Sequence, residues 1–401
     1  MLSELPYPES PSHGYIPADG ARPGPTPCST GMPLAHPPEE LAAWLRLTLE
    51  PGLGPPTVRQ LLAIFGLPQH IYAQPRSVLA EHLPAAVADQ LARPPSDEFR
   101  ETFERTLRWC DTPGHQVLTL ADAGYPPCLL DIHDPPPMLY VVGDPGWLTR
   151  PAIAIVGARH ATPDGLSTAR AFARRLAREG WCIISGMALG IDTAAHEGAL
   201  EAEGGTVAVV GTGADVVYPA RNRKLAARIE AAGALVSELP LGTPALAHQF
   251  PRRNRLVAGL ARGTLVTEAA ARSGSLITAR LAAEAGRDVF AIPGSIHSPL
   301  SRGCHALIRQ GAKLVESPED VLEELCGPDD LIRRAQGETA PVRDELLAAM
   351  GYGPVALDDL ARRSGLAIPD LQARLLDLEL RGRVARLGGG RYQVVCPPHE
   401  A

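Results

Sequence analysis

The chain has 401 residues, of which 45% are apolar, so it is long enough for two or three domains with a sizeable core. No run of about 18 apolar residues occurs, and the N-terminus lacks the basic and apolar regions of a signal peptide, so we expect neither a membrane span nor secretion. The seven cysteines are scattered and form no CxxC pair. This spacing argues against a zinc site or a disulfide framework and favours a reducing cytoplasm.

The formal net charge is −7, which is unusual for a protein that binds nucleic acid. The charge is unevenly distributed, however. Residues 151–315 contain 19 Lys and Arg against 12 Asp and Glu, whereas the rest of the chain contains 19 against 33. A basic middle segment with acidic flanks is compatible with an anionic ligand for the middle segment, and equally with an ordinary solvated surface.

The first part of the chain changes character near residue 38. Residues 1–37 are rich in Pro, Gly and Ser without an apolar period, which predicts a disordered tail. Residues 38–110 are predicted to form a helical domain, because apolar residues recur at helical spacing on both sides of Gly52-Leu53-Gly54. This pattern fits either a helix-hairpin-helix that contacts DNA or a plain helical hairpin, and we favour the plain hairpin slightly.

The middle of the chain, residues 111–325, is predicted to be an α/β core with an extended Rossmann-like parallel sheet. A proline-punctuated connector ends in a strand at Met138–Val142, and short apolar runs then alternate with helical patterns. Such alternation predicts a parallel sheet covered on both faces. The runs are Ala152–Val156, Trp181–Ser185, Thr206–Val210, Ala234–Ser237, Thr264–Thr267 and Asp288–Ile292, with a further strand at Ala312–Val315.

The last part of the chain is predicted to be a linker over 326–340 and a winged helix over 341–397. Helical patterns at 343–350, 357–363 and 369–380 precede two short strands that flank a glycine turn. The expected recognition helix, 369–380, is net negative, which is poor for a DNA groove. We therefore favour a protein-interaction or auxiliary role for this unit.

Ligands of open α/β sheets bind beyond the carboxyl ends of the strands, so the residues after each strand are the candidate site. Gly157 and Arg159 follow the first strand of the core, where glycine permits close approach and arginine can bind a phosphate. Ser185, Gly186 and Gly190 follow the second strand and precede a helix. Their small side chains predict a nest of backbone amides that binds an anion.

A second group of candidates begins the helix that precedes the fifth strand. It contains Phe250, Arg252, Arg253, Asn254 and Arg255. Arginines there can follow a phosphate backbone, and Phe250 can stack on a base. The three arginines cannot share one face of a helix, so we expect some of them to be structural.

A third polar loop follows the fifth strand and contains Ser273 and Ser275 just before another helix. Several loops of this kind meet at one edge of the sheet. This arrangement predicts an extended phosphate-binding rim rather than one catalytic pocket, and it calls for neither a metal nor a cofactor.

The sequence also leaves two enzymatic alternatives. Gly211-Thr212-Gly213 resembles the start of a dinucleotide fingerprint, but Val216 replaces the third glycine and the motif follows the third strand, so an NAD-dependent oxidoreductase is disfavoured. A nucleotide-hydrolysing enzyme of a related Rossmann-like fold, with Glu268 as a candidate catalytic group, remains the main alternative. Asp192 and His196 lie four residues apart on one helix, which fits a structural pair better than a catalytic triad with Ser185.

Together these loops resemble the DNA-processing protein A family, also called DprA or Smf. The resemblance rests on Gly157-Ala-Arg159, Ser185–Asp192 with His196, Tyr218-Pro219, Phe250–Arg255 and Ser273–Thr278. It extends over roughly residues 40 to 395.

The resemblance implies a protein that binds single-stranded DNA without breaking bonds, forms a homodimer and loads RecA during natural transformation. It implies Arg159 and the Phe250–Arg255 segment as DNA contacts, with Phe250 stacking on a base. Family members often carry a lysine before the Phe-Pro pair, where this chain reads Ala247-His248-Gln249, so that phosphate contact is weakened or moves to Arg252.

Overall fold

The computed structural model describes residues 36–325, 346, 350, 355–380, 383–387 and 391–394. The predicted tail, apart from its last two residues, and the predicted linker over 326–340 lie outside these ranges. The expected first helix of the winged helix, 343–350, falls within them only at residues 346 and 350. The strands and helices that carry the candidate site are all described.

The first helices that the structure describes are short and pack around their own core, as the apolar spacing predicts. Their bounds are α1 (Pro38–Leu49), α2 (Pro55–Phe65), α3 (Pro68–Tyr72), α4 (Arg76–Leu79), α5 (Ala85–Leu91) and α6 (Asp97–Cys110). Gly52 turns the chain between α1 and α2 with a φ of +83°. The Arg46 guanidinium donates to the Leu91 and Arg93 carbonyls, so this arginine holds the helices together.

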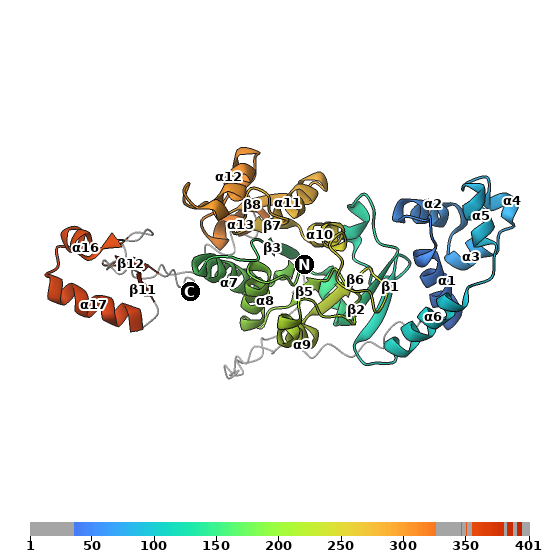
Figure 1. Cartoon of the computed structure of the whole chain (residues 1–401), viewed down its shortest axis with the longest axis horizontal. Helices are drawn as coiled ribbons and strands as arrows, with labels where there is room; N and C mark the ends of the chain where they lie inside the picture. Colours follow the sequence, from blue (N-terminus) through green and yellow to red (C-terminus); the bar gives the residue numbers. More distant parts are fainter. Residues whose placement is uncertain are drawn as a thin grey trace, which may run out of the picture. The chain divides into compact units, whose positions relative to one another are not determined.

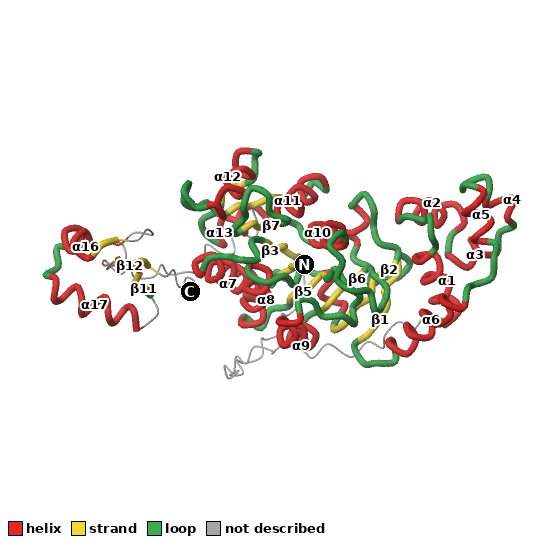
Figure 2. The backbone as a smooth tube through the Cα atoms, in the orientation of Figure 1, coloured by secondary structure: helices red, strands yellow, loops and turns green. Residues whose placement is uncertain are grey.

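A nine-stranded sheet forms the centre of the fold (Figures 1 and 2). Its order is β1-β2-β6-β5-β4-β3-β7-β8-β9, parallel from β6 to β9 and antiparallel at the β1–β2 and β2–β6 pairs. The strands are β1 (His115–Thr119), β2 (Met138–Gly143), β3 (Ala152–Val156), β4 (Cys182–Ser185), β5 (Thr206–Val209), β6 (Ala234–Ser237), β7 (Gly263–Val266), β8 (Asp288–Ala291) and β9 (Lys313–Leu314). The predicted Rossmann-like sheet is confirmed, and β1 is a strand where the sequence indicated only a connector.

Helices cover both faces of this sheet, with α10, α11 and α12 on one side and α7, α8 and α9 on the other (Figure 1). α13 packs on the second side with α7. Their bounds are α7 (Pro163–Arg178), α8 (Ile191–Glu201), α9 (Arg223–Ala232), α10 (Gln249–Leu260), α11 (Ser275–Glu284), α12 (Arg302–Arg309) and α13 (Pro318–Leu325). Short 3-10 turns lie at Pro127–Asp131, Pro145–Thr149, Ala220–Asn222 and Pro299–Ser301.

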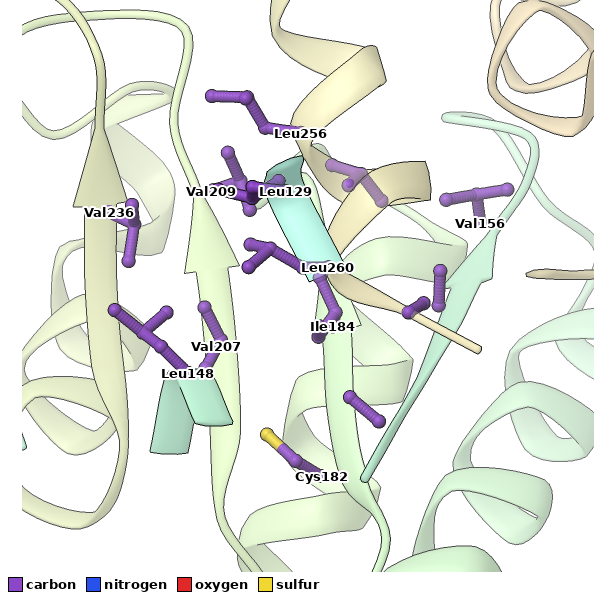
Figure 3. Close-up of a cluster of buried hydrophobic side chains, with 14 of the residues drawn as sticks. Leu129, Leu148, Val156, Cys182, Ile184, Val207, Val209, Val236, Leu256 and Leu260 are labelled. Atoms are coloured by element: carbon purple, nitrogen blue, oxygen red, sulfur yellow. The ribbon is translucent and has the colours of Figure 1, made fainter. Parts of the chain in front are cut away.

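The core explains why the central strands read as unbroken apolar runs. Alternate residues of β3 enter different clusters: Ala154 and Val156 face α10, whereas Ile153 and Ile155 face α7. Strands buried on both faces need apolar residues at every position. Figure 3 shows the cluster on the α10 side, where Leu256 and Leu260 lie over Ile184 and Val209.

The last described residues form a small unit with its own sheet and core. It contains β10 (Val355–Ala356), α16 (Leu357–Ser364), α17 (Ile368–Leu380), β11 (Val384–Leu387) and β12 (Arg391–Val394), with strand order β10-β12-β11. Leu360, Leu371 and Leu375 are buried in it. Two helices followed by a β11–β12 hairpin agree with the predicted winged helix.

Within the described part of the chain, no helix has the length and apolar character needed to cross a bilayer.

Candidate functional site

The candidate loops meet at the point where the sheet reverses its order. The chain runs from β3 outward through β4, β5 and β6, and α10 then returns it to β7 on the other side of β3. Such a switch point leaves a crevice beyond the carboxyl ends of the strands, where ligands of open α/β sheets bind. The loop 157–162, the loop 186–190, the start of α10 and the loop 267–274 all lie at this edge.

Arg159, Phe250 and Tyr218 come from three separate segments and form a cluster at this edge, in which Arg159 and Tyr218 are exposed and Phe250 is half-buried. The Arg159 guanidinium lies 5.8 Å from the centre of the Phe250 ring, within cation–π range. The Tyr218 ring lies 5.5 Å from Phe250, and Tyr218 is 47% exposed. No ion-pair partner for Arg159 lies among the described residues. Its charge is therefore available to an anionic ligand beside two aromatic rings.

Arg253, in contrast, is buried and links the elements that carry the site. Its Nη1 donates to the Gly186 carbonyl at 2.5 Å and to the Val209 carbonyl, which joins α10 to the ends of β4 and β5. Burial lowers the pKa of Arg253 to about 10, which still leaves it cationic at neutral pH. Arg253 is thus a positioning residue and not a surface contact.

The predicted anion nest at 186–190 exists, but the protein's own carboxylate occupies it. The buried Asp192 accepts hydrogen bonds from the Gly186 and Ala188 amides at 3.1 and 3.2 Å. Burial raises the pKa of Asp192, while the nearby Arg253 and these amides act in the opposite direction. These amides are therefore committed inside the protein and do not face a phosphate.

The glycines at this edge are needed for close packing. A Cβ at Gly190, whose φ is +82°, would lie 2.3 Å from the Ala158 carbonyl oxygen. A Cβ at Gly157 would lie 2.6 Å from Ile191, and one at Gly186 would lie 2.6 Å from the Arg253 guanidinium. Larger residues would force the loops apart and displace Arg159 with them.

Glu268 occupies the place where a Rossmann fold usually binds a phosphate, at the start of the first helix. Its carboxylate accepts from the Thr162 amide at 2.9 Å and from the Thr162 hydroxyl at 2.6 Å. Thr162 in turn caps α7 by accepting from the Gly165 amide. A Cβ at Gly165 would lie 2.4 Å from the Glu268 carboxyl carbon, so there is no room for a phosphate at this position.

The other two arginines of α10 have opposite environments. Arg255 is buried and pairs with Asp134 at 2.8 Å and with Glu238 at 2.5 Å. The Arg252 side chain is 51% exposed, and its Nε lies 3.5 Å from Glu238. The expectation that only some of these arginines face solvent is met, with Arg252 outside and Arg253 and Arg255 inside.

The polar residues of the remaining loops mostly bond within the protein. The buried Ser185 hydroxyl donates to the Ile155 carbonyl at 2.6 Å. The Ser273 and Ser275 hydroxyls lie 2.7 Å apart, and the Asn254 amide nitrogen donates to the Gly274 carbonyl at 3.4 Å. Asn254 therefore links α10 to this serine loop.

The sequence motifs indicated most of this edge but missed two contributors. Tyr218 was noted only as part of the family pattern, although its place after the third strand already suggested a site residue. No sequence motif indicated Glu238, because its role depends on Arg252 and Arg255, which only the fold brings close to it. Among the described residues, no group of three or more His, Cys, Asp or Glu could hold a metal ion.

His196 is buried against Thr206 and not against Ser185. Its Nδ1 lies 2.7 Å from the Thr206 hydroxyl, which itself donates to the Ile183 carbonyl, so Nδ1 is the protonated nitrogen. Nε2 is buried and has no hydrogen-bond partner among the described residues. The Ser185, Asp192 and His196 side chains thus have separate partners and form no triad.

The buried His196 should make the stability of the core depend on pH. Burial lowers the pKa of His196 from 6.5 to about 3. Below about pH 6.5 the imidazole is therefore protonated in the unfolded chain but stays neutral in the folded chain. Stability is therefore present above pH 6.5 and falls as the pH drops, by about 2 kcal/mol between pH 7 and pH 5. Urea denaturation at several pH values should show this loss in the wild type and a smaller loss in His196→Gln. Parallel losses in the two proteins would contradict this assignment.

Comparison with known proteins places this geometry in one family. The family profile described as DNA recombination-mediator protein A matches residues 116–326, and the profile of the DprA winged helix domain matches residues 332–390. The protein Smf of Escherichia coli is 43% identical over 301 residues, which cover 73% of this chain and 80% of that protein.

Two comparisons with Streptococcus pneumoniae agree. Its DNA processing protein DprA is 48% identical over 206 residues, covering 51% of this chain and 73% of that protein. The X-ray structure of DNA processing protein A from this organism shares 37% identity with a TM-score of 0.61, covering 70% of this chain and 95% of that one. The profile matches, the identities and the shared fold show that the chain belongs to the DNA recombination-mediator protein A family, known as DprA or Smf.

Proposed function

We propose that the chain binds single-stranded DNA at the switch-point edge of its sheet and breaks no bond in it. The observation that carries this proposal is the exposed Arg159 beside the Phe250 and Tyr218 rings. A cation next to aromatic faces matches the two features of a nucleic-acid strand, its charged phosphates and its flat bases. The chain's membership in the DNA recombination-mediator protein A family supports the same proposal.

The charge distribution supports a polyanionic ligand. Exposed cations stand in the loops and helix starts that follow the strands, at Arg159, Arg221, Lys224, Arg252 and Arg272. These cations would neutralise several phosphates of a DNA strand that passes along this edge. The release of the counterions of that DNA would favour binding. Such binding weakens steeply as the salt concentration rises and depends little on sequence.

The aromatic pair favours a single strand over a duplex. Bases in a duplex are stacked on each other, and only unpaired bases can be splayed onto side-chain rings. Phe250 and Tyr218 lie beside Arg159, so one nucleotide can contact a ring with its base and the guanidinium with its phosphate.

The internal contacts argue against nucleotide hydrolysis, the main alternative. Glu268, the candidate catalytic group for hydrolysis, accepts hydrogen bonds from Thr162. Its carboxylate occupies the position that the phosphate of a bound nucleotide would take. Asp192 is buried and accepts a hydrogen bond from the Gly186 amide, and His196 is buried and hydrogen-bonded to the Thr206 hydroxyl. Binding without chemistry is therefore the function that we propose.

We further propose that the chain acts in the cytoplasm as a homodimer and helps to load RecA onto incoming single-stranded DNA during natural transformation. The resemblance to the family suggested these roles. A surface that holds a strand mainly by charge and stacking can release it to another DNA-binding protein. The short edge strand β9, with Leu314 44% exposed, leaves one edge of the sheet for a second copy.

Arg159→Ala should weaken binding of single-stranded oligonucleotides of every sequence. It should also lower the slope of log affinity against log salt by about one unit, because one phosphate contact is lost. Fluorescence anisotropy at several salt concentrations measures both quantities. The matched control is Arg178→Ala, an exposed arginine at the opposite edge of the sheet. Equal affinities of Arg159→Ala and the control would refute the phosphate contact.

Phe250→Ala should cost about 1–3 kcal/mol of binding free energy, since stacking on one base is lost. Phe250→Tyr keeps an aromatic ring and should retain most of the affinity. The comparison is made by anisotropy at one salt concentration. If the alanine and tyrosine variants bind equally well, Phe250 does not stack on a base.

The proposed dimer and the proposed loading of RecA are tested by sedimentation and with purified RecA on single-stranded DNA. The wild type should sediment as a dimer and shorten the lag before RecA filaments form, whereas Arg159→Ala should sediment as a dimer and shorten the lag less. An unchanged lag with the wild type would contradict the loading of RecA. Sedimentation as a monomer at micromolar concentration would contradict the homodimer.

A further inference from the structure

The loop between β6 and α10, residues 238–248, is bonded to the segment that carries Tyr218. The Gly242 amide of this loop donates to the Asp215 carboxylate at 2.8 Å. In the other direction, the Gly213 amide donates to a carbonyl of the loop at 3.0 Å. Because bonds run both ways between them, the loop and the segment that follows β5 hold each other in place at the carboxyl edge of the sheet.

The same loop leads directly into α10, the helix that carries Phe250. The Leu246 amide donates to the Gln249 side chain at 3.1 Å, and the Gln249 amide donates to the Leu246 carbonyl at 3.0 Å. These reciprocal bonds fix the start of α10 to the loop. A displacement of the loop would therefore move the Phe250 ring relative to the Tyr218 ring, which lies 5.5 Å from it.

Two contacts join this loop to the N-terminal helices. The Leu241 side chain is buried in one cluster with Leu41 and Trp44 of α1. The Arg105 guanidinium of α6 donates to the Leu241 carbonyl at 3.3 Å. The neighbouring Gly242 has a φ of +80°, and a Cβ at this position would lie 2.9 Å from Nη1 of Arg105. The glycine therefore permits the close approach of the arginine to the loop backbone.

We propose that the N-terminal helices position the two aromatic rings of the DNA site, and that Arg105 does so by holding the 238–248 loop. This inference rests on the proposed binding of single-stranded DNA and gives the helical domain a role in it. Arg105 is a positioning residue, because it bonds to the loop backbone and acts on the strand only through Tyr218 and Phe250. Release of the loop lowers the affinity by disturbing these rings and removes no phosphate contact.

The competing role for Arg105 is a direct contact with a phosphate of the strand. The salt dependence of binding separates the two roles. Loss of a phosphate contact lowers the slope of log affinity against log salt by about one unit. Loss of a positioning residue lowers the affinity at every salt concentration and leaves this slope unchanged.

Arg105→Ala should weaken the binding of single-stranded oligonucleotides about threefold to tenfold, the effect of one lost hydrogen bond, with an unchanged salt slope. Arg105→Lys keeps a donor for the Leu241 carbonyl and should retain most of the affinity. The matched control is Arg108→Ala, which removes the same charge from another exposed position of α6 and should bind like the wild type. Fluorescence anisotropy at several salt concentrations measures the affinity and the slope for all four proteins.

A double-mutant cycle with Phe250→Ala tests how Arg105 acts. If Arg105 positions the ring, Arg105→Ala should add little to the loss in Phe250→Ala, because the stacking that it supports is already absent. Hydrogen exchange of the free proteins gives a second measurement. The amides between residues 239 and 246 should exchange faster in Arg105→Ala than in the wild type, and they should be unchanged in Arg108→Ala.

The outcomes separate this inference from the proposed function. Wild-type affinity in Arg105→Ala, full additivity with Phe250→Ala, or a salt slope lower by one unit would overturn the positioning role and leave the proposed function intact. Failure of the wild type to bind single-stranded DNA would overturn the proposed function itself.

Discussion

The candidate site depends on one buried interaction, the hydrogen bonds from the Arg253 guanidinium to the carbonyl oxygens of Gly186 and Val209. These bonds join α10 to the ends of two neighbouring strands. A buried charge is costly unless it is paired and hydrogen-bonded, and here Asp192 lies close enough to compensate it. Because Phe250 and Arg252 lie at the start of α10 within three residues of Arg253, the position of Arg253 also sets the positions of these two residues.

The edge of the sheet therefore has an inner and an outer layer of charge. In the inner layer, Asp192 fills the amide nest and Glu268 fills the phosphate position of the first helix, so the protein satisfies its own anion sites. The outer layer contains Arg159 and Arg252 with the Phe250 and Tyr218 rings. A small nucleotide would need the inner positions, whereas an extended strand needs only the outer surface. This division is the physical basis for proposing binding and not hydrolysis.

Much of this fold could be predicted from the sequence, because its strands are buried on both faces and read as uninterrupted apolar runs. The runs at β3 and β6 match the strands residue for residue, and the helix expected to begin with Phe250 begins one residue earlier, at Gln249. β1 was missed because His115 and Gln116 interrupt its apolar pattern at the antiparallel edge of the sheet. The family resemblance is confirmed by the matching profiles and identities.

The candidate site was less predictable, because helical spacing shows that three arginines cannot share a face but does not show which of them are buried. The burial of Arg255 depends on Asp134 and Glu238, which lie in loops without a periodic pattern, and the burial of Arg253 depends on the Gly186 and Val209 carbonyls. Hydrogen exchange of the full chain, with and without single-stranded DNA, tests the central claim most directly. The account predicts protection at 157–162, 211–222, 248–254 and 271–275 that disappears at high salt. Protection confined to the opposite edge of the sheet, or to residues 355–394, would contradict it.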